Sequence, residues 1–347
     1  MMQAHMGRLC SVMRVLGVWG IVGLIILALP QLSHAEPTLT IYSGRGERFT
    51  RPVLQAFTEQ TGIAVRMQTG SSAALLAKLR EEGTRSPADV FITNYVGVLE
   101  EARKHDLLTP CTSPMVAQIP AEFRATDNTW LAFSARMRVI VYNTNLVQPG
   151  GITSVLDLAD PKWHGQVATV TSGNQSFIGG LTALYAVLGE KKTTAFLQGL
   201  KANSRGLVMP KHTPIVKAVA AGQVPLGYVN HYYYYRYKAK QPQAPLGIVF
   251  PDQGPEGTGS VVTVAGAAIL RASKHRETAQ RFMEFLIAPQ GQQIFAEVNY
   301  EYPVNPQVPA HPAVVPRQTL KLAPVNLALA YASRTRAIAL IEQVGLE

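Results

Sequence analysis

Hydrophobic residues in the first third of the chain alternate between the two-residue spacing of a strand and the spacing of a helix. Short apolar runs end in glycine or polar turns, and each is followed by a longer segment with apolar residues at helical intervals. The pattern predicts strands over 39–44, 63–69 and 88–93, and helices over 49–62, 71–83 and 96–108. This β-α-β-α-β-α order is typical of an α/β fold, an open sheet covered by helices.

Two longer extended runs, 130–143 and 259–270, interrupt this rhythm. Between and after them the alternation resumes. It predicts helices over 177–189, 191–202 and 213–223, a strand over 225–230 that leads directly into a helix, helical residues over 275–298 broken at Pro289, and one or two helices over 324–345. We therefore expect two α/β lobes joined by extended crossover strands, with a ligand cleft between them.

The first 35 residues have the layout of a secretory signal peptide. Arg8 and Arg14 precede an apolar run, and the small residues Ser33 and Ala35 follow it, so we expect cleavage after Ala35. An uncleaved membrane anchor is the alternative, although the apolar run is short for one. Cys10 lies before the apolar core and no cysteine follows at a lipoprotein position, which favours a free periplasmic protein.

Composition narrows the class further. With 347 residues, 47% of them hydrophobic and 16% charged, the chain fits a globular protein of two domains rather than a disordered one. The net charge of +10 suits an anionic partner, and because the basic residues are scattered we expect small anions rather than nucleic acid. Only Cys111 remains after the signal peptide, so no internal disulfide is expected.

The candidate chemistry lies in the run HYYYYR, residues 231–236. Successive side chains on a helix point in different directions, so at most two or three of these phenols can share one site. The run begins where a predicted strand ends, with Asn230 as a candidate N-cap, and irregular backbone at such a junction can aim adjacent side chains at one point. Two phenols together suit either aromatic packing and sugar stacking, or a hard trivalent ion such as Fe(III) that displaces their protons.

Several stretches resemble the ferric-binding proteins of bacterial iron-uptake ABC transporters. They keep the family's order over nearly the whole chain after the signal peptide. The stretches are LTIYSGRGE, AFTEQTGIAV, EEGTRSPADVF, WLAFSARMRVIVYNT, VNHYYYYR, GAAIL and EYPVNP. The resemblance implies a two-lobed periplasmic-binding-protein type 2 fold with two extended hinge strands. It places 36–136 and about 263–300 in the N-terminal lobe, and 137–262 and about 301–347 in the C-terminal lobe.

The same resemblance implies the roles of individual residues. Tyr232 and Tyr233 match the adjacent tyrosines that bind Fe(III) in that family, while Tyr234, Tyr235 and Tyr237 turn away with the helix. Arg136 matches the arginine that holds a synergistic anion such as carbonate, and Arg138 is expected to be structural. The further anion-binding candidates are Asn230, Asn174, Ser176, His212 and Arg45.

The chain departs from the family pattern at two positions. Gly46 stands where some members have a histidine, and Asn94 stands where some have a glutamate ligand. Either carbonate, citrate or another chelating anion fills the remaining positions of the ion, or Tyr95 or Glu47 contributes from the N-terminal lobe. We favour anions because the chain is basic and Arg45 lies in a loop flanked by glycines.

The function implied is capture of Fe(III) with a synergistic anion and its delivery to an ABC transporter permease in the inner membrane, by a protein expected to be a monomer. A second reading keeps the transport class and changes the cargo to a small organic anion or a chelated metal, such as a phosphonate, a sugar phosphate or ferric citrate. A secreted hydrolase is the distant alternative. The sequence has no G-x-S-x-G or H-E-x-x-H motif, so no enzyme and no catalytic residue is expected.

Overall fold

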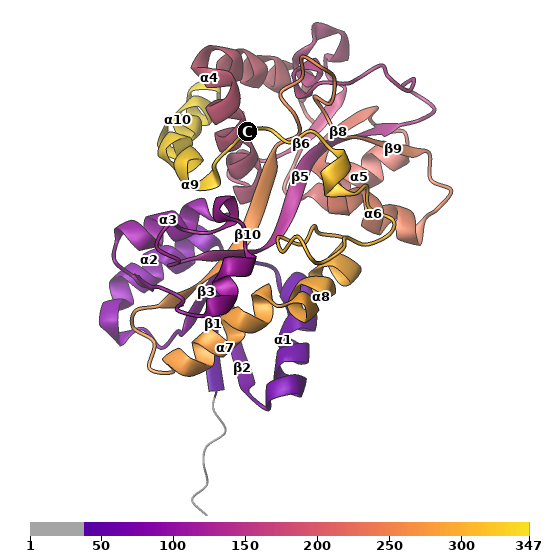
Figure 1. Ribbon diagram of the computed structural model, residues 1–347. Coiled ribbons are helices and arrows are strands. Elements are labelled where there is room, and N and C mark those ends of the chain that lie inside the picture. The colour runs from indigo at the N-terminus through magenta and orange to yellow at the C-terminus, as the bar shows by residue number, and fades with distance from the viewer. Residues whose placement is uncertain (1–37, 347) are drawn as a thin grey trace, which may run out of the picture. The chain divides into compact units, whose positions relative to one another are not determined.

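Strands and helices alternate at the start of the chain in the predicted order (Figure 1). The computed structural model describes residues 38–346, and the predicted signal peptide lies outside this range. The first elements are β1 (Thr38–Ser43), α1 (Glu47–Thr61), β2 (Ala64–Thr69), α2 (Ser72–Glu82), β3 (Val90–Thr93), α3 (Gly97–Lys104), β4 (Leu108–Thr109) and the long strand β5 (Leu131–Asn143).

The alternation continues to α6, and two strands and then four helices follow it. The remaining elements are β6 (Val167–Val170), α4 (Gln175–Asn203), β7 (Val208–Met209), α5 (His212–Ala220), β8 (Leu226–Asn230), α6 (His231–Lys240), β9 (Leu246–Val249), β10 (Val262–Leu270), α7 (Arg276–Ile287), α8 (Pro289–Asn299), α9 (Leu327–Ala330) and α10 (Arg334–Val344). The two helices predicted around Gly189 form the single element α4, which is kinked where Gly189 adopts a φ of 72°. The predicted break at Pro289 is confirmed, because this proline begins α8.

One sheet path connects these strands in the order β2-β1-β3-β10-β5-β8-β6-β7, with β4 beside β10 and β9 beside β5. The long strand β5 changes partners along its length. Its residues up to Met137 pair with β10, and those from Arg138 onward pair with β8 and β9. The two extended runs are therefore crossover strands that pass between the two halves of the sheet, as predicted.

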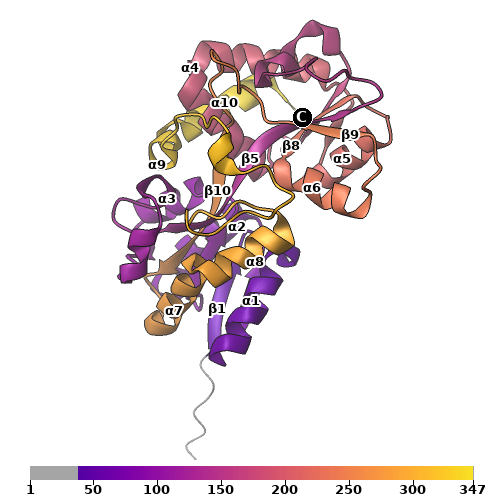
Figure 2. The same ribbon diagram turned by 45° about the vertical axis from the view of Figure 1, so that its right-hand side comes forward.

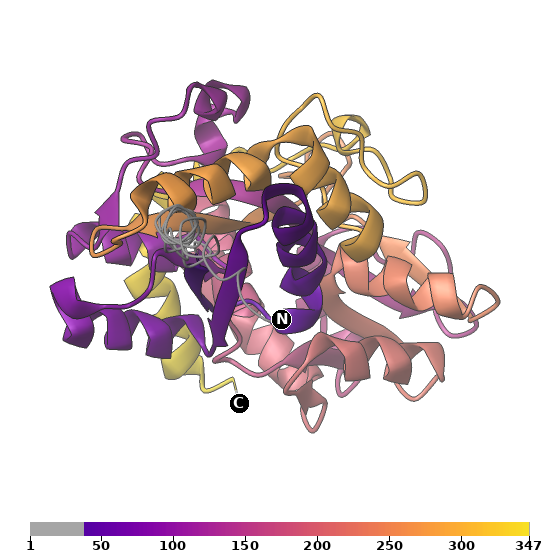
Figure 3. The same cartoon turned by 90° about the horizontal axis from the view of Figure 1, so that it is seen from below.

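The helices that cover the sheet also pack against one another in pairs. Helix α1 packs against α8, α4 against α10, and α5 against α6. Figure 3 shows α7 and α8 following one another past α1. Figure 2 shows α5 and α6 side by side, with the start of α6 near α1 and α8. None of the helices within residues 38–346 is long and apolar enough to cross a membrane.

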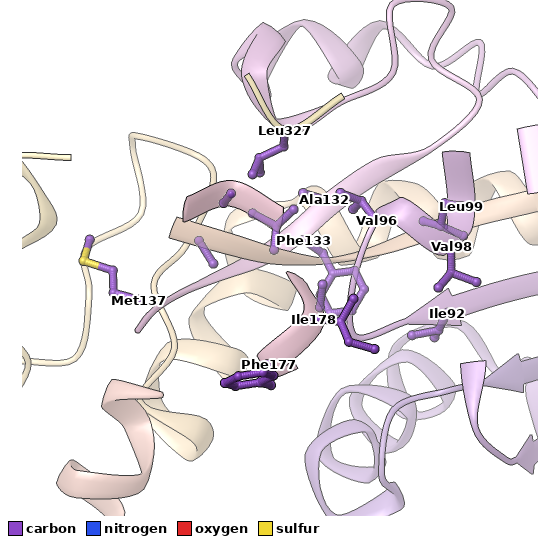
Figure 4. Close-up of a cluster of buried hydrophobic side chains, with 14 of the residues drawn as sticks. Ile92, Val96, Val98, Leu99, Ala132, Phe133, Met137, Phe177, Ile178 and Leu327 are labelled. Atoms are coloured by element: carbon purple, nitrogen blue, oxygen red, sulfur yellow. The ribbon is translucent and has the colours of Figure 1, made fainter. Parts of the chain in front are cut away.

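A buried apolar cluster joins the strands to the helices around β5 (Figure 4). Ile92 of β3, Phe133 of β5 and Phe177 of α4 are all within 1% of complete burial. Each fully buried side chain of this size contributes about 1.5–3 kcal/mol by leaving water. The cluster holds α3 and the start of α4 on the crossover strands, which positions the residues that follow.

Candidate functional site

The tyrosine pair lies where strand β8 passes into helix α6. Asn230 is the last residue of the strand and His231 the first of the helix. The rings of Tyr232 and Tyr233 are 4.4 Å apart between centroids and inclined by 34°. Tyr232 is 7% exposed and Tyr233 is half-buried. Both phenols therefore lie in the first turn of α6, where their rings pack against each other, and not on the irregular backbone that was expected.

Asn230 stands at the N-cap position, but its side chain makes no capping hydrogen bond, so that prediction is wrong in its chemistry. Its Oδ1 accepts from Arg138 Nη1 at 3.2 Å, and its Nδ2 donates to the Tyr232 hydroxyl at 3.4 Å. Arg138 also donates to the Tyr228 carbonyl at 3.1 Å and lies 3.9 Å from the centre of the Tyr228 ring. Asn230 thus links the structural arginine to the tyrosine pair.

Arg136 differs from Arg138 because both of its terminal nitrogens lack an acceptor in the described part of the chain. It is 2% exposed, and neither Nη1 nor Nη2 has a hydrogen-bond partner among the described residues. Burial lowers the pKa of Arg136, and the neighbouring Tyr232 and Glu301 oppose that shift. A buried guanidinium without acceptors costs free energy, and it is the donor set that a bound anion would satisfy.

A chain of contacts runs from α4 through α5 to the tyrosine pair. Asn174 Oδ1 accepts from the Ser176 amide at 3.1 Å and from its hydroxyl at 2.7 Å. Ser176 Oγ lies 2.9 Å from His212 Nε2, and the His212 ring lies 4.9 Å from the Tyr233 ring. Because the Ser176 proton is directed at Asn174, Nε2 of His212 donates to Ser176 and Nδ1 is left without a partner.

Burial, followed by the charges of Arg138 and Arg136, lowers the pKa of His212 well below its ordinary value. The imidazole is therefore neutral near pH 7, and its free Nδ1 is an acceptor. Asn174, Ser176 and His212 were each expected in the anion site, and the structure brings the three together beside Tyr233. Their binding roles stay predictions.

Arg45 lies in the same cluster of charges, but its guanidinium already has a carboxylate partner. Nη2 donates to Glu301 Oε2 at 2.5 Å, and the two side chains are 2% and 0% exposed. Three phenylalanine rings, of Phe49, Phe133 and Phe295, lie 5.3–5.8 Å from the guanidinium carbon. An anion role for Arg45 would compete with this buried ion pair, so that role stays a prediction.

Glu301 is the residue that sequence reasoning missed. Its Oε1 is buried without a hydrogen-bond partner, although Oε2 holds Arg45. Glu301 is the first residue of the stretch EYPVNP. The signal in the sequence that could have found it is its acidic side chain, because the other charged candidates for the site are basic. Glu301 follows Tyr300, a non-glycine residue with a φ of 61° that ends α8, so the chain reverses sharply just before the carboxylate.

The positions that depart from the family pattern carry no metal ligand side chain. Gly46 has no side chain, and Asn94 Nδ2 donates to the Gly44 carbonyl at 2.8 Å. Glu47 is exposed and pairs with Arg51. The Tyr95 ring packs against Gly97 and Gly179, and its hydroxyl interacts with Thr182 of α4. A cleft role for Tyr95 stays a prediction.

The aromatic neighbours of the pair pack as expected. The Tyr235 ring stacks 6.4 Å from that of Tyr300, and its hydroxyl accepts from the Val315 amide at 3.3 Å. His231 is turned toward β5, where its Nδ1 accepts from the Met137 amide at 3.2 Å. Burial lowers the pKa of His231 to about 3. Within residues 38–346 no three His, Cys, Asp or Glu side chains are grouped so that they could hold a metal ion.

Comparison with known families gives a match over most of the chain. A model of the bacterial extracellular solute-binding protein family matches residues 53–320. The Fe(3+)-binding periplasmic protein of Serratia marcescens is 32% identical over 321 residues, which cover 91% of this chain and 93% of the relative.

Solved structures agree with these matches. Iron-bound HitA from Pseudomonas aeruginosa superimposes with a TM-score of 0.82 at 30% identity, over 89% of this chain and all of that chain. A Trichodesmium protein in complex with iron and citrate ligands superimposes with a TM-score of 0.76 at 32% identity, over 89% of this chain and all of that chain. The expected two-lobed α/β fold is therefore confirmed.

Proposed function

Because the chain belongs to the bacterial extracellular solute-binding protein family, we propose that it captures ferric iron and delivers it to the permease of an ABC transporter. Of the relatives described above, the Serratia marcescens protein is named for Fe(3+), and the two solved structures have iron bound. In this proposal the protein works in the periplasm as a monomer, and its cargo is Fe(III) held together with a synergistic anion.

One observation supports the proposal above all others: Arg136 presents two buried, unpartnered nitrogens beside the tyrosine pair. A trivalent ion held by two phenolates keeps a positive charge, so an anion is required beside it. A bound anion would satisfy Arg136 and the metal at once, with charge-assisted hydrogen bonds to the guanidinium. Carbonate and citrate both fit this description.

In this proposal the phenols bind the metal only after they lose their protons. Burial, followed by the proximity of Tyr232, raises the pKa of Tyr233 well above its ordinary value. The Tyr233 phenol is therefore neutral until a cation displaces its proton. Fe(III) supplies that charge, while a sugar or a phosphonate does not.

Delivery requires that the permease recognise the loaded protein. The crossover strands β5 and β10 are the segments about which the two halves would hinge. Iron and anion contact groups from both halves in the proposed site, so binding favours a closed arrangement. No chemical change of the cargo is needed for this step.

The test is the visible colour of the ferric complex. Purified protein titrated with ferric salt and bicarbonate is expected to turn red to purple by charge transfer from phenolate to Fe(III). Tyr232→Phe combined with Tyr233→Phe is expected to abolish that band. The matched control, Tyr234→Phe combined with Tyr237→Phe, removes two phenols from the same helix and is expected to keep it.

Colour that persists in the Tyr232/Tyr233 variant would show that these phenols are not the ligands. If the parent protein gives no colour but binds phosphonate or a sugar phosphate in calorimetry, the cargo is an organic anion instead. Both outcomes overturn the proposal.

A further inference from the structure

The ring of Phe49 contacts the tyrosine pair from the opposite half of the sheet. Phe49 lies in the first turn of α1, which follows β1, whereas the pair lies in α6, which follows β8 on the other side of β5. The Phe49 ring centroid is 5.7 Å from that of Tyr232, and the two planes are inclined by 70°. This is the edge-to-face arrangement that aromatic rings prefer. Figure 2 shows the start of α6 near α1 and α8, where the contact is made.

The apolar core of the protein does not hold Phe49 in this position. Among the described residues, the core cluster includes neither Phe49 nor Tyr232, although it includes Phe57 of the same helix and Tyr235 of α6. Phe49 is half-buried, and Tyr232 is 7% exposed. Because core packing does not fix the Phe49 ring, other contacts must place it against the phenol.

The side chain of Asn299 supplies the first of these contacts. Asn299 is the last residue of α8 and is 1% exposed. Its Nδ2 donates to the Phe49 carbonyl at 3.1 Å, and its Oδ1 accepts from Arg236 Nη1 at 3.2 Å. A neutral amide can donate and accept at the same time, so one side chain connects α1 to α6. The relay from Arg236 through Asn299 to Phe49 therefore joins the two halves beside the tyrosine pair.

Arg236 also contacts the Phe49 ring itself. It lies one helical turn after Tyr232, so the two side chains are on one face of α6. Its guanidinium carbon is 5.1 Å from the centre of the Phe49 ring, and those of Arg45 and Arg48 are 5.3 and 4.8 Å away. Cations within about 6 Å of an aromatic centre are attracted to the ring. Phe49 is therefore held by its ring as well as by its backbone carbonyl.

We infer that Phe49 is a positioning residue for Tyr232: its ring, held by Asn299 and Arg236, covers the phenol and slows the loss of bound iron. This inference rests on the proposed ferric function and deepens it. The ring keeps water from one side of the pair, which strengthens the attraction between a cation and the phenolates. Because Phe49 comes from the opposite half of the sheet, its contacts must break before the two halves separate and the iron leaves.

The test compares variants of Phe49 in the loss of bound iron. The ferric form of each protein is mixed with excess EDTA, and the decay of the charge-transfer band gives the rate of release. Phe49→Ala is expected to release iron about fivefold faster, which corresponds to about 1 kcal/mol, and to shift the band because the Tyr232 ring is no longer held at one angle. Phe49→Trp keeps an aromatic ring and is expected to restore the parent's rate and band.

A second variant tests the relay. Asn299→Asp keeps an acceptor for Arg236 but has no donor for the Phe49 carbonyl, so it is expected to speed release by about threefold. The matched control, Tyr237→Ala, removes a half-buried ring of α6 that packs against the apolar core, and it is expected to release iron like the parent. Release at the parent rate in Phe49→Ala or in Asn299→Asp overturns the inference, and so does release from Tyr237→Ala as fast as from Phe49→Ala.

An iron-free measurement separates this inference from the ferric assignment. Tetranitromethane nitrates accessible tyrosines in the apo protein, and mass spectrometry of peptides locates the modified rings. Nitration of Tyr232, measured against the half-buried Tyr185 of α4, is expected to rise in Phe49→Ala and to stay at the parent level in Phe49→Trp.

The two tests can fail separately. If Tyr232→Phe combined with Tyr233→Phe keeps the ferric colour, the ferric assignment fails, whatever the nitration of Tyr232 shows in the Phe49 variants. If that double variant loses the colour as expected but Phe49→Ala leaves both release and nitration unchanged, only the positioning role of Phe49 fails.

Discussion

The two sides of the tyrosine pair are built in different ways. On the side of α4, α5 and β5, buried polar atoms have no hydrogen-bond partner within the described chain: Arg136 has two such nitrogens that donate, and His212 has one that accepts. On the side of the loop before α1, the buried charges are paired with each other, since Arg45 Nη2 donates to Glu301, although Arg45 Nε and Glu301 Oε1 have no partner among residues 38–346. Asn94 there holds the Gly44 carbonyl.

This difference indicates where an exogenous ligand is needed. A side with unsatisfied buried groups gains free energy when an anion arrives, whereas a side with a closed ion pair must break it to take part. Gly46 and Asn94 stand where some family members have a histidine and a glutamate ligand, and no other side chain of the protein has to take the place of those ligands. In our interpretation a bound anion takes their place, and it is held mainly from the side of Arg136.

The largest expected effect is a loss of stability when the buried ion pair between Arg45 and Glu301 is broken. Glu301→Gln leaves the buried Arg45 charge without its counter-ion, and removing one partner of such a pair costs about 3 kcal/mol of stability. Thermal or urea unfolding of the apo protein measures this loss. The control is Glu190→Gln, since Glu190 and Arg336 form a pair with side chains about half exposed, and its loss should stay below about 1 kcal/mol.

The comparison fails if Glu301→Gln leaves stability unchanged but abolishes the ferric colour. That result would make Glu301 a ligand, because its Oε1 is buried and free. Both sides of the tyrosine pair would then contribute directly to the metal, and less anion would be needed.

The next effect separates the two buried arginines. Arg136→Met removes a charge that has no partner, so the apo protein should keep its stability while ferric binding in bicarbonate weakens by about 100-fold. Arg138→Met removes donors to Asn230 and the Tyr228 carbonyl, so it should lower stability by about 2–3 kcal/mol. Ferric titration and urea unfolding of both variants measure the two quantities.

Equal losses of stability in the two variants would show that Arg136 is structural in the same way as Arg138. If Arg136→Met binds ferric iron as tightly as the parent, the anion is not held by Arg136. Either outcome would contradict the contrast on which the proposed function depends.

Local pattern was sufficient to predict most of the fold. Glycine ended α1 at Gly62 with a φ of 70°, and Pro289 separated α7 from α8, because these residues act on the backbone where they stand. The alternation of apolar runs predicted the strands for the same reason. The pattern predicts two helices that are separated near Gly189, and in the structure the glycine kinks one helical element at the same place.

The site was harder to predict because its contacts are distant in sequence. Arg45 and Glu301 are 256 positions apart, and no spacing rule connects them. Asn230 was expected to cap α6 because of its position, yet a buried arginine and a phenol compete successfully for its side chain. The sequence around Asn230 does not contain Arg138, so it does not indicate which hydrogen bond the asparagine side chain makes.

The smallest expected effect comes from introducing a metal-binding side chain into the loop before α1. Gly46 is exposed with φ −61° and ψ 139°, and a Cβ there would meet only Phe49 Cδ2, at 3.7 Å. Gly46→His should therefore change stability by about 0.5 kcal/mol or less. In bicarbonate-free buffer its ferric affinity should rise by up to about tenfold, because an imidazole can occupy a position that the anion otherwise fills.

The neighbouring glycine provides the matched control. A Cβ on Gly44 would lie 1.9 Å from Ser72 Oγ, so Gly44→Ala should lower stability by about 1–3 kcal/mol without raising ferric affinity. If Gly46→His binds iron no better than the parent without bicarbonate, the loop before α1 does not face the ion. The dependence on an anion would then follow from the Arg136 side alone, because no ligand supplied from the loop could relieve it.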